Sequence, residues 1–136
     1  AVVFVESVAV TYFVGTSRWC KEVVETYRLS QDSVAASNRL KRRTFFWAVM
    51  GMLAAVGIAA LGGASDPATL RSNTKAWADY HLIGAISGIV FIVWTYFLTW
   101  SNIVANQAII TGLVNEVGRV RKERGLDMDQ AVKESR

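Results

Sequence analysis

Few side chains in this sequence carry acid–base, nucleophilic or metal-binding chemistry. The 136 residues include one histidine, His81, and one cysteine, Cys20. No Cys/His metal spacing, phosphate loop or nucleophile–base pattern is present, so we expect neither an enzyme nor a metal site. A single cysteine also excludes an internal disulfide, and we expect Cys20 to be a small buried thiol. Any chemistry therefore rests on isolated polar residues beside apolar segments.

Two ionisable residues, His81 and Glu6, lie next to or inside such segments. An imidazole at His81 has the chemistry of an axial haem ligand or of a proton-handling group near a quinone. One histidine per chain forms a bis-histidine haem only across a symmetric pair, so the simpler interpretation is a polar residue at the end of a span. Glu6 interrupts an apolar run, and a charged group at membrane depth would be costly and a functional candidate.

Two asparagines, Asn102 and Asn106, are four residues apart and share one helix face. They suit hydrogen bonds across helices, and the alternative is binding of a polar ligand. An asparagine in an apolar seam also sets the register of packed helices, at some cost in stability.

The elements that must position these residues are two long uncharged runs, 44–64 and 82–101. About 20 apolar residues, at about 1.5 Å each, cross about 30 Å of hydrocarbon as a helix. The segment 65–81 between them holds the only proline, Pro67, and polar turn formers. The sequence therefore predicts two transmembrane helices joined as an antiparallel hairpin by an outer loop at 65–81.

Basic residues cluster on the outer flanks of this hairpin, and the net charge is +4. Because basic residues are retained on the cytoplasmic side, both flanks should be cytoplasmic, in a cytoplasmic (inner) membrane. Beside apolar runs, such charges favour anionic lipid head groups rather than nucleic acid. The residues predicted to bind head groups are Arg39, Lys41, Arg42, Arg43, Arg119, Arg121 and Lys122.

Small residues recur every four positions in the spans and should allow close helix packing. The contact is either within one hairpin or between subunits. In the order of the sequence, these residues are Gly51, Ala55, Ala59, Gly63, Gly84 and Gly88.

Both predicted helices should extend beyond the spans into the cytoplasm, over about 35 and about 45 residues by the helical pattern. Asn106 lies within an apolar stripe that continues to about Arg124, and this stripe must be covered by the 30–43 segment, the N-terminal helix or another subunit. Gly125 suits the helix end. A short helix, capped by Asp127 and Gln130, is expected in the tail 125–136. The apolar members of the stripe are Ile103, Ile110, Leu113, Val117 and Val120.

The N-terminal segment 1–29 admits two interpretations. It lies as an amphipathic or partly embedded helix at the membrane interface, or it forms a third span with Glu6 inside the bundle. We favour the first, because Gly15, Thr16 and Ser17 follow only a short apolar run before Arg18. No basic region precedes that run and no convincing cleavage site follows it, so we expect no cleaved signal peptide.

These patterns predict an all-α integral membrane protein: the segment 1–29, a hairpin with cytoplasmic extensions over 30–124, and the tail. The absence of catalytic groups and the small-residue faces favour a structural or accessory subunit that packs into a homo-oligomer or a larger membrane complex. Two alternatives remain, a membrane anchor that binds haem or quinone near His81 and a small oligomeric channel with Glu6 or Asn102 along its path.

Overall fold

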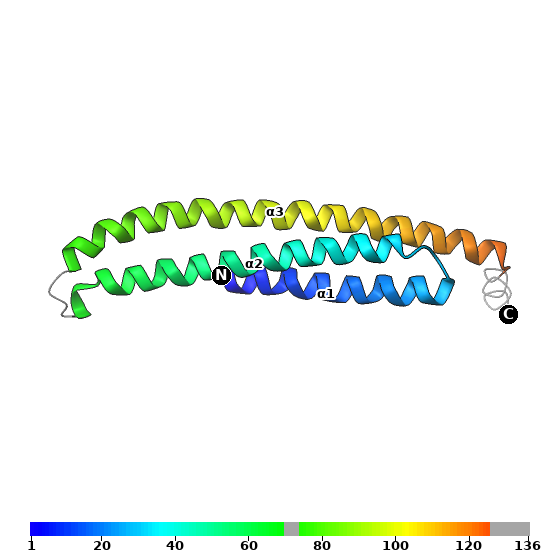
Figure 1. The fold of residues 1–136 in the computed structure, drawn as a ribbon, viewed down its shortest axis with the longest axis horizontal. Coiled ribbons are helices and arrows are strands. Elements are labelled where there is room, and N and C mark those ends of the chain that lie inside the picture. Colours follow the sequence, from blue (N-terminus) through cyan, green and yellow to red (C-terminus); the bar gives the residue numbers. More distant parts are fainter. Residues whose placement is uncertain (70–73, 126–136) are drawn as a thin grey trace, which may run out of the picture.

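The computed structural model describes residues 1–69 and 74–125 and is built from helices (Figure 1). Helix α1 spans Val2–Tyr27, α2 spans Asp32–Ser65 and α3 spans Thr74–Glu123. A short 3₁₀ turn, η1, covers Pro67–Thr69. The described residues contain no strand, so the all-helical prediction is confirmed.

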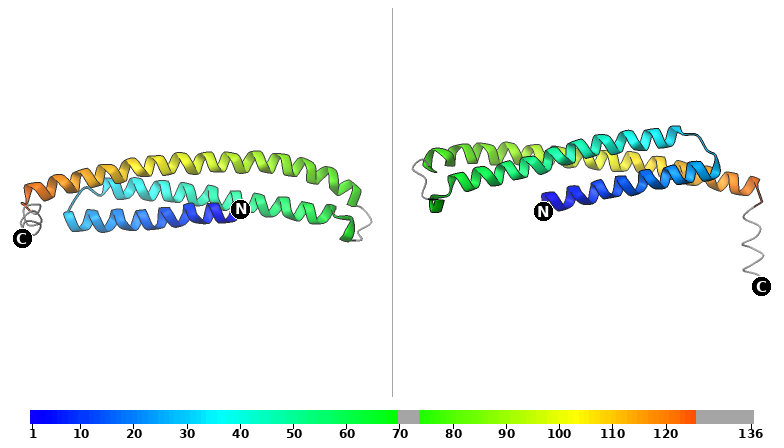
Figure 2. Two further views of the ribbon diagram at one scale, coloured as in Figure 1. Left: turned by 180° about the vertical axis from the view of Figure 1, so that it is seen from behind. Right: turned by 60° about the horizontal axis from the view of Figure 1, so that its bottom comes forward.

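The three helices form an elongated bundle with two different halves (Figures 1 and 2). Helices α2 and α3 make an antiparallel hairpin; we call its end at η1 and the start of α3 the connector end and the opposite end, at residues 28–31, the turn end. Helix α1 begins near the middle of the hairpin and runs to the turn end, antiparallel to α2. The bundle therefore has three helices toward the turn end and two toward the connector end.

Two of the helices, α2 and α3, are long and apolar enough to cross a membrane. In the most apolar part of each, mean hydropathy is 2.0 and only 11% of the residues are buried. The predicted spans 44–64 and 82–101 lie inside these helices, which have 34 and 50 residues. Helix α3 begins at Thr74, so the connector is shorter than the predicted loop 65–81. The prediction from hydropathy placed the start of α3 too late, because the first turns of this helix are polar.

The helix ends follow local backbone chemistry. At the end of α1, Arg28 adopts a left-handed conformation with φ 57°, and the Leu29 N–H donates to the Val24 carbonyl oxygen over 3.0 Å. After α3, Gly125 has φ 68° and its N–H donates to the Lys122 carbonyl oxygen, as expected of a glycine that ends a helix. The helix predicted after Gly125 lies outside the described residues.

The buried residues of each helix recur in steps of three, four and seven. On α3, four of the buried residues are spaced seven apart, and three buried residues on each of α2 and α1 show the same spacing. A seven-residue repeat keeps one face of a helix against its neighbours only if the helices wind around each other in a left-handed sense. The buried residues that show this spacing are Ile92, Thr99, Asn106 and Leu113 on α3, Ser37, Thr44 and Gly51 on α2, and Glu6, Phe13 and Cys20 on α1.

Glycines set the distance between α2 and α3 at four levels. A Cβ atom at Gly51 would lie 2.9 Å from Thr95 Oγ1, and one at Gly62 would lie 3.2 Å from the His81 ring. At Gly84 and Gly88 the opposing atoms belong to Leu61 and Ile58, at 2.6 and 2.5 Å from the added Cβ. Because these positions carry no side chain, a side chain of the facing helix packs directly against the backbone.

We predict that Gly51→Ala destabilises the bundle relative to Gly57→Ala, its matched control on the same helix. Alanine at Gly57 meets nothing within 4 Å, whereas at Gly51 it pushes on the Thr95 hydroxyl, which also donates to the Ile92 carbonyl oxygen. We expect Gly51→Ala to be less stable by about 1–3 kcal/mol. Unfolding in detergent micelles, followed by circular dichroism, measures the difference. Equal stability of the two variants would show that α2 and α3 are not tightly apposed at Gly51.

Candidate functional site

The interior of the bundle holds more polar than apolar side chains among the described buried residues. In a water-soluble protein, by contrast, the interior is mostly apolar. Buried polar groups are costly unless they are hydrogen-bonded. We call this set the polar core; its members are Glu6, Ser17, Ser37, Thr44, Thr95, Thr99, Asn102 and Asn106.

Asn106 joins all three helices at one level of the polar core. Its Nδ2 donates to Thr16 Oγ1 on α1 over 3.0 Å and makes a longer contact, 3.4 Å, with the Tyr12 hydroxyl. Its Oδ1 accepts from Ser37 Oγ on α2 over 3.0 Å. Ser37 lies in turn 3.4 Å from Ser17 Oγ on α1. The amide of Asn106 can donate and accept at once, so a single side chain fixes the register of three helices.

Asn102, one turn nearer the connector end, joins only α2 and α3. Its Nδ2 donates to Thr44 Oγ1 over 2.9 Å, and both side chains are buried. The expected hydrogen bonds across helices from Asn102 and Asn106 are therefore present in the structure.

Glu6 occupies the next level, where α1 meets the hairpin. Its side chain is fully buried, at 0% exposure, and its Oε1 lies 3.4 Å from Thr95 Oγ1. The missing side chain of Gly51 makes the room, since a Cβ there would lie 3.3 Å from Glu6 Oε1. The second oxygen, Oε2, is buried without a hydrogen-bond partner.

A groove of about 480 Å³ runs between α1 and α3 beside this level. It exists because α1 packs mainly on α2 and contacts α3 along a narrower line. Thr99 lies in its wall, and the Thr99 Oγ1 atom is buried without a hydrogen-bond partner. The remaining lining is apolar or aromatic: Val5, Val8, Ala9, Tyr12, Tyr96, Trp100 and Ile103.

The turn end of the polar core is closed by apolar side chains. Cys20, Val24 and Leu113 form a buried cluster, against which Leu29, Val34, Ile109 and Ile110 pack. Burial raises the pKa of the Cys20 thiol, and a contact with Ser37 partly offsets this. The cytoplasmic stripe predicted on α3 is therefore covered by α1 and the start of α2. Within that stripe Leu113 is buried, and Ile110 and Val117 are half-buried.

His81 lies far from Glu6 along the bundle, near the connector end. Its ring packs over Gly62, where an added Cβ would lie 3.2 Å from Cε1. The ring nitrogen Nδ1 is buried without a hydrogen-bond partner. His81 and Glu6, the two ionisable candidates of the sequence, are thus parts of different levels and do not form one site.

The small-residue positions divide between the inside and the outside of the chain. Gly51, Gly84 and Gly88 pack within the hairpin, whereas Ala59 and Gly63 are exposed. Ala55 is half-buried. The four-residue strip therefore rotates out of the hairpin contact toward the connector end, because a contact of period 3.5 cannot follow a spacing of four.

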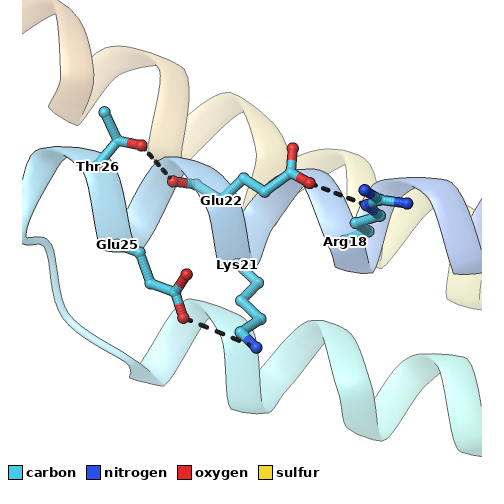
Figure 3. A network of polar contacts seen from close by, with 5 residues as sticks. All are labelled: Arg18, Lys21, Glu22, Glu25 and Thr26. Carbon is cyan, nitrogen blue, oxygen red and sulfur yellow. Dashed lines mark hydrogen bonds and ion pairs between the residues drawn. The ribbon is translucent and has the colours of Figure 1, made fainter.

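Charged side chains lie on the outside of the bundle toward the turn end. On α1, Arg18 pairs with Glu22 over 2.9 Å and Lys21 with Glu25 over 3.8 Å, four residues apart in each case (Figure 3). The Thr26 hydroxyl donates to the Glu22 backbone carbonyl oxygen over 2.7 Å. Such exposed pairs contribute little to stability, and they mark a surface suited to water. The basic residues Arg39, Arg42, Arg43, Arg119 and Lys122 are exposed too, and Lys41 and Arg121 are half-buried.

The sequence indicated Glu6, Asn102 and Asn106 but not the buried threonines of the polar core. Thr44, Thr95 and Thr99 lie inside uncharged runs, where hydropathy counts them only as mildly polar. The seven-residue spacing from Thr44 to Gly51 and from Thr99 to Asn106 was the available signal. No group of three or more metal-binding side chains occurs among the described residues.

No family model matches this chain, and no similar curated protein or solved structure was found.

We predict that Asn106→Ala lowers the stability of the bundle, with Asn115→Ala as its control. The alanine leaves Ser37 and Thr16 without the partner that holds them across three helices. Buried polar groups left unpaired cost about 1–3 kcal/mol. Asn115 is exposed on the same helix, so its truncation should change stability little. Unfolding in micelles measures both, and equal effects would contradict a structural role for the Asn106 network.

Proposed function

We propose that this chain is an integral membrane protein of a cytoplasmic membrane, with the connector outside and the turn end in the cytoplasm. The observation that carries the proposal is the inverted distribution of side chains. The polar core is inside, while large apolar side chains such as Leu53, Ile86 and Phe97 are more than half exposed. In water such a surface would be unfavourable, whereas lipid solvates it at no cost.

The surface of α1 supports a membrane boundary within this helix. Phe4 and Val14 are exposed at 73% and 55%, yet Arg18 and Glu22, one and two turns later, form an exposed ion pair. On α2 the same change occurs between Arg43 and Phe45. Val14 and Phe45 line one shallow pocket with Arg42, so both helices change from charged to apolar at a common level. The first half of α1 would then lie in lipid alongside α2, and the basic residues of α2 would face anionic head groups.

Within the membrane, we propose that the chain acts as a structural or accessory subunit that packs into a homo-oligomer or a larger complex. Toward the connector end a second groove, of about 480 Å³, lies between α2 and α3. Small residues Gly57 and Ser87 line it with the packed Gly84 and Gly88. Helices in lipid associate through such shallow, small-residue surfaces, because van der Waals contact rather than the hydrophobic effect holds them together.

The orientation is tested by cysteine labelling. Ala68→Cys places a thiol in the connector and Gln31→Cys places one at the turn end, both at exposed positions. We expect a membrane-impermeant maleimide to label Ala68→Cys in intact bacterial cells or spheroplasts and Gln31→Cys only after permeabilisation. Native Cys20 can stay, because it is fully buried and burial raises the pKa of its thiol. The opposite labelling pattern would reverse the proposed topology.

The packing role is tested by mass in mild detergent. Gly57→Leu should fill the second groove without disturbing the chain's own fold, since a Cβ at Gly57 meets nothing within 4 Å. We expect the parent chain to be an oligomer or to co-purify with partners, and Gly57→Leu to shift it toward the monomer. Gly112→Leu, equally free of contacts but outside the groove, is the control. A monomeric parent without partners would rule the proposal out.

A further inference from the structure

Glu6 is a buried carboxyl group for which the bundle supplies no counter-charge. Among the described residues, Glu22, Glu25, Glu116 and Glu123 form ion pairs away from the polar core, and none of these pairs involves Glu6. An isolated carboxylate in a low-dielectric interior is far more costly than a neutral acid. A negative charge on Glu6 would therefore need a neighbouring group that stabilises it.

The titratable groups on the helices around Glu6 do not compensate it. Helix α2 has none between Arg43 and Asp66, which are near its two ends. Helix α3 has only the Tyr96 phenol within the run 82–101. On α1 the nearest are the Ala1 amino group, at the exposed start of the helix, and the Tyr12 hydroxyl, which lies near Asn106.

The Thr95 hydroxyl beside Glu6 is better placed to accept a hydrogen bond from Glu6 than to donate one. Thr95 has a single hydroxyl proton, and its shorter hydrogen bond, 2.8 Å, goes to the Ile92 carbonyl oxygen. The contact with Glu6 Oε1 is longer, at 3.4 Å. Because the Thr95 O–H donates to the Ile92 carbonyl oxygen, the lone pairs of Thr95 Oγ1 face Glu6. A neutral carboxylic acid at Glu6 can donate its own O–H to them.

We propose that Glu6 is a proton-binding site, a neutral carboxylic acid held between the three helices and reached from the groove between α1 and α3. Thr99 lies in the groove wall and follows Thr95 by one helical turn, and its own hydroxyl oxygen has no hydrogen-bond partner. Gly51 supplies the space for the carboxyl. The site depends on the packing within one chain and not on the oligomer proposed above.

An apolar carbodiimide, dicyclohexylcarbodiimide, is a direct probe because it reacts with protonated carboxyl groups. The acid O–H adds across one C=N bond, and the acyl group then migrates to nitrogen. The adduct keeps every atom of the reagent and needs no oxidant or leaving group. Peptide mass spectrometry locates and quantifies it in the full chain in detergent or liposomes.

We expect at least about tenfold more adduct at Glu6 than at exposed Glu22 at neutral pH, since an ordinary exposed glutamate is protonated to less than about 1% at pH 7. The adduct should decrease as the pH is raised and should be unchanged by added NaCl. Labelling of Glu6 no greater than that of Glu22 counts against the proposal. Protection by sodium ions overturns it in favour of a cation site.

Infrared spectroscopy tests the same proposal without requiring a reagent to reach Glu6. A protonated carboxyl has an infrared C=O stretching band distinct from those of a carboxylate, and this band should be present in the parent and lost in Glu6→Gln. Glu6→Gln is isosteric with the neutral acid, so we expect it to fold, with Glu22→Gln as the control that keeps the band. Absence of the band from the folded parent overturns the proposal.

Discussion

The bundle depends on hydrogen bonds between polar side chains that face inward from all three helices. A buried amide or hydroxyl without a partner costs more than the bond it forms contributes, so these groups penalise every register except the one that pairs them. Asn106 is the clearest case, because its amide meets Ser37 on α2 and Thr16 on α1 at once. A shift of either helix by one turn would break both bonds. Apolar contacts of similar size would tolerate such a shift far better.

Small side chains make this polar interior possible. Hydroxyl and amide groups are short, so their helices must come close before the groups can meet. Gly51 provides the closest approach at the level of Glu6, and Gly84 and Gly88 hold the hairpin together where the polar core has ended. The spacing of three and four residues keeps these positions on one side of each helix along the bundle. The close packing of the helices and the pairing of their polar side chains therefore both follow from the spacing of small and polar residues at three and four.

The two halves of the bundle are suited to different tasks. In the half toward the turn end, α1 covers the hairpin, and the polar core is sealed by the cluster of Cys20, Val24 and Leu113. The three-helix half ends where α1 begins (Figure 2), and Glu6 lies in the second turn of that helix. Beyond it the hairpin stands alone, with a groove at Gly57 and Ser87 open to another helix. The proton site and the packing surface we propose thus occupy separate levels, and a variant of one should leave the other intact.

The sequence by itself determined the features that depend on composition along one helix. The length of the uncharged runs predicted α2 and α3, and Gly125 predicted the end of α3, because span length and helix termination are local properties. The same runs concealed the start of α3 at Thr74, since hydropathy does not separate a polar helical turn from a loop.

Only the tertiary structure decided which neighbours α1 packs against. Its sequence was compatible with a helix at the interface or a third span, and packing placed it lengthwise against α2 with Glu6 between Gly51 and Thr95. The partners of Glu6 are 45 and 89 residues away in the chain, at distances that no local pattern encodes. Which small residues pack inside the chain and which remain outside was likewise set by how the helices wind around each other, a property of the bundle and not of any one helix.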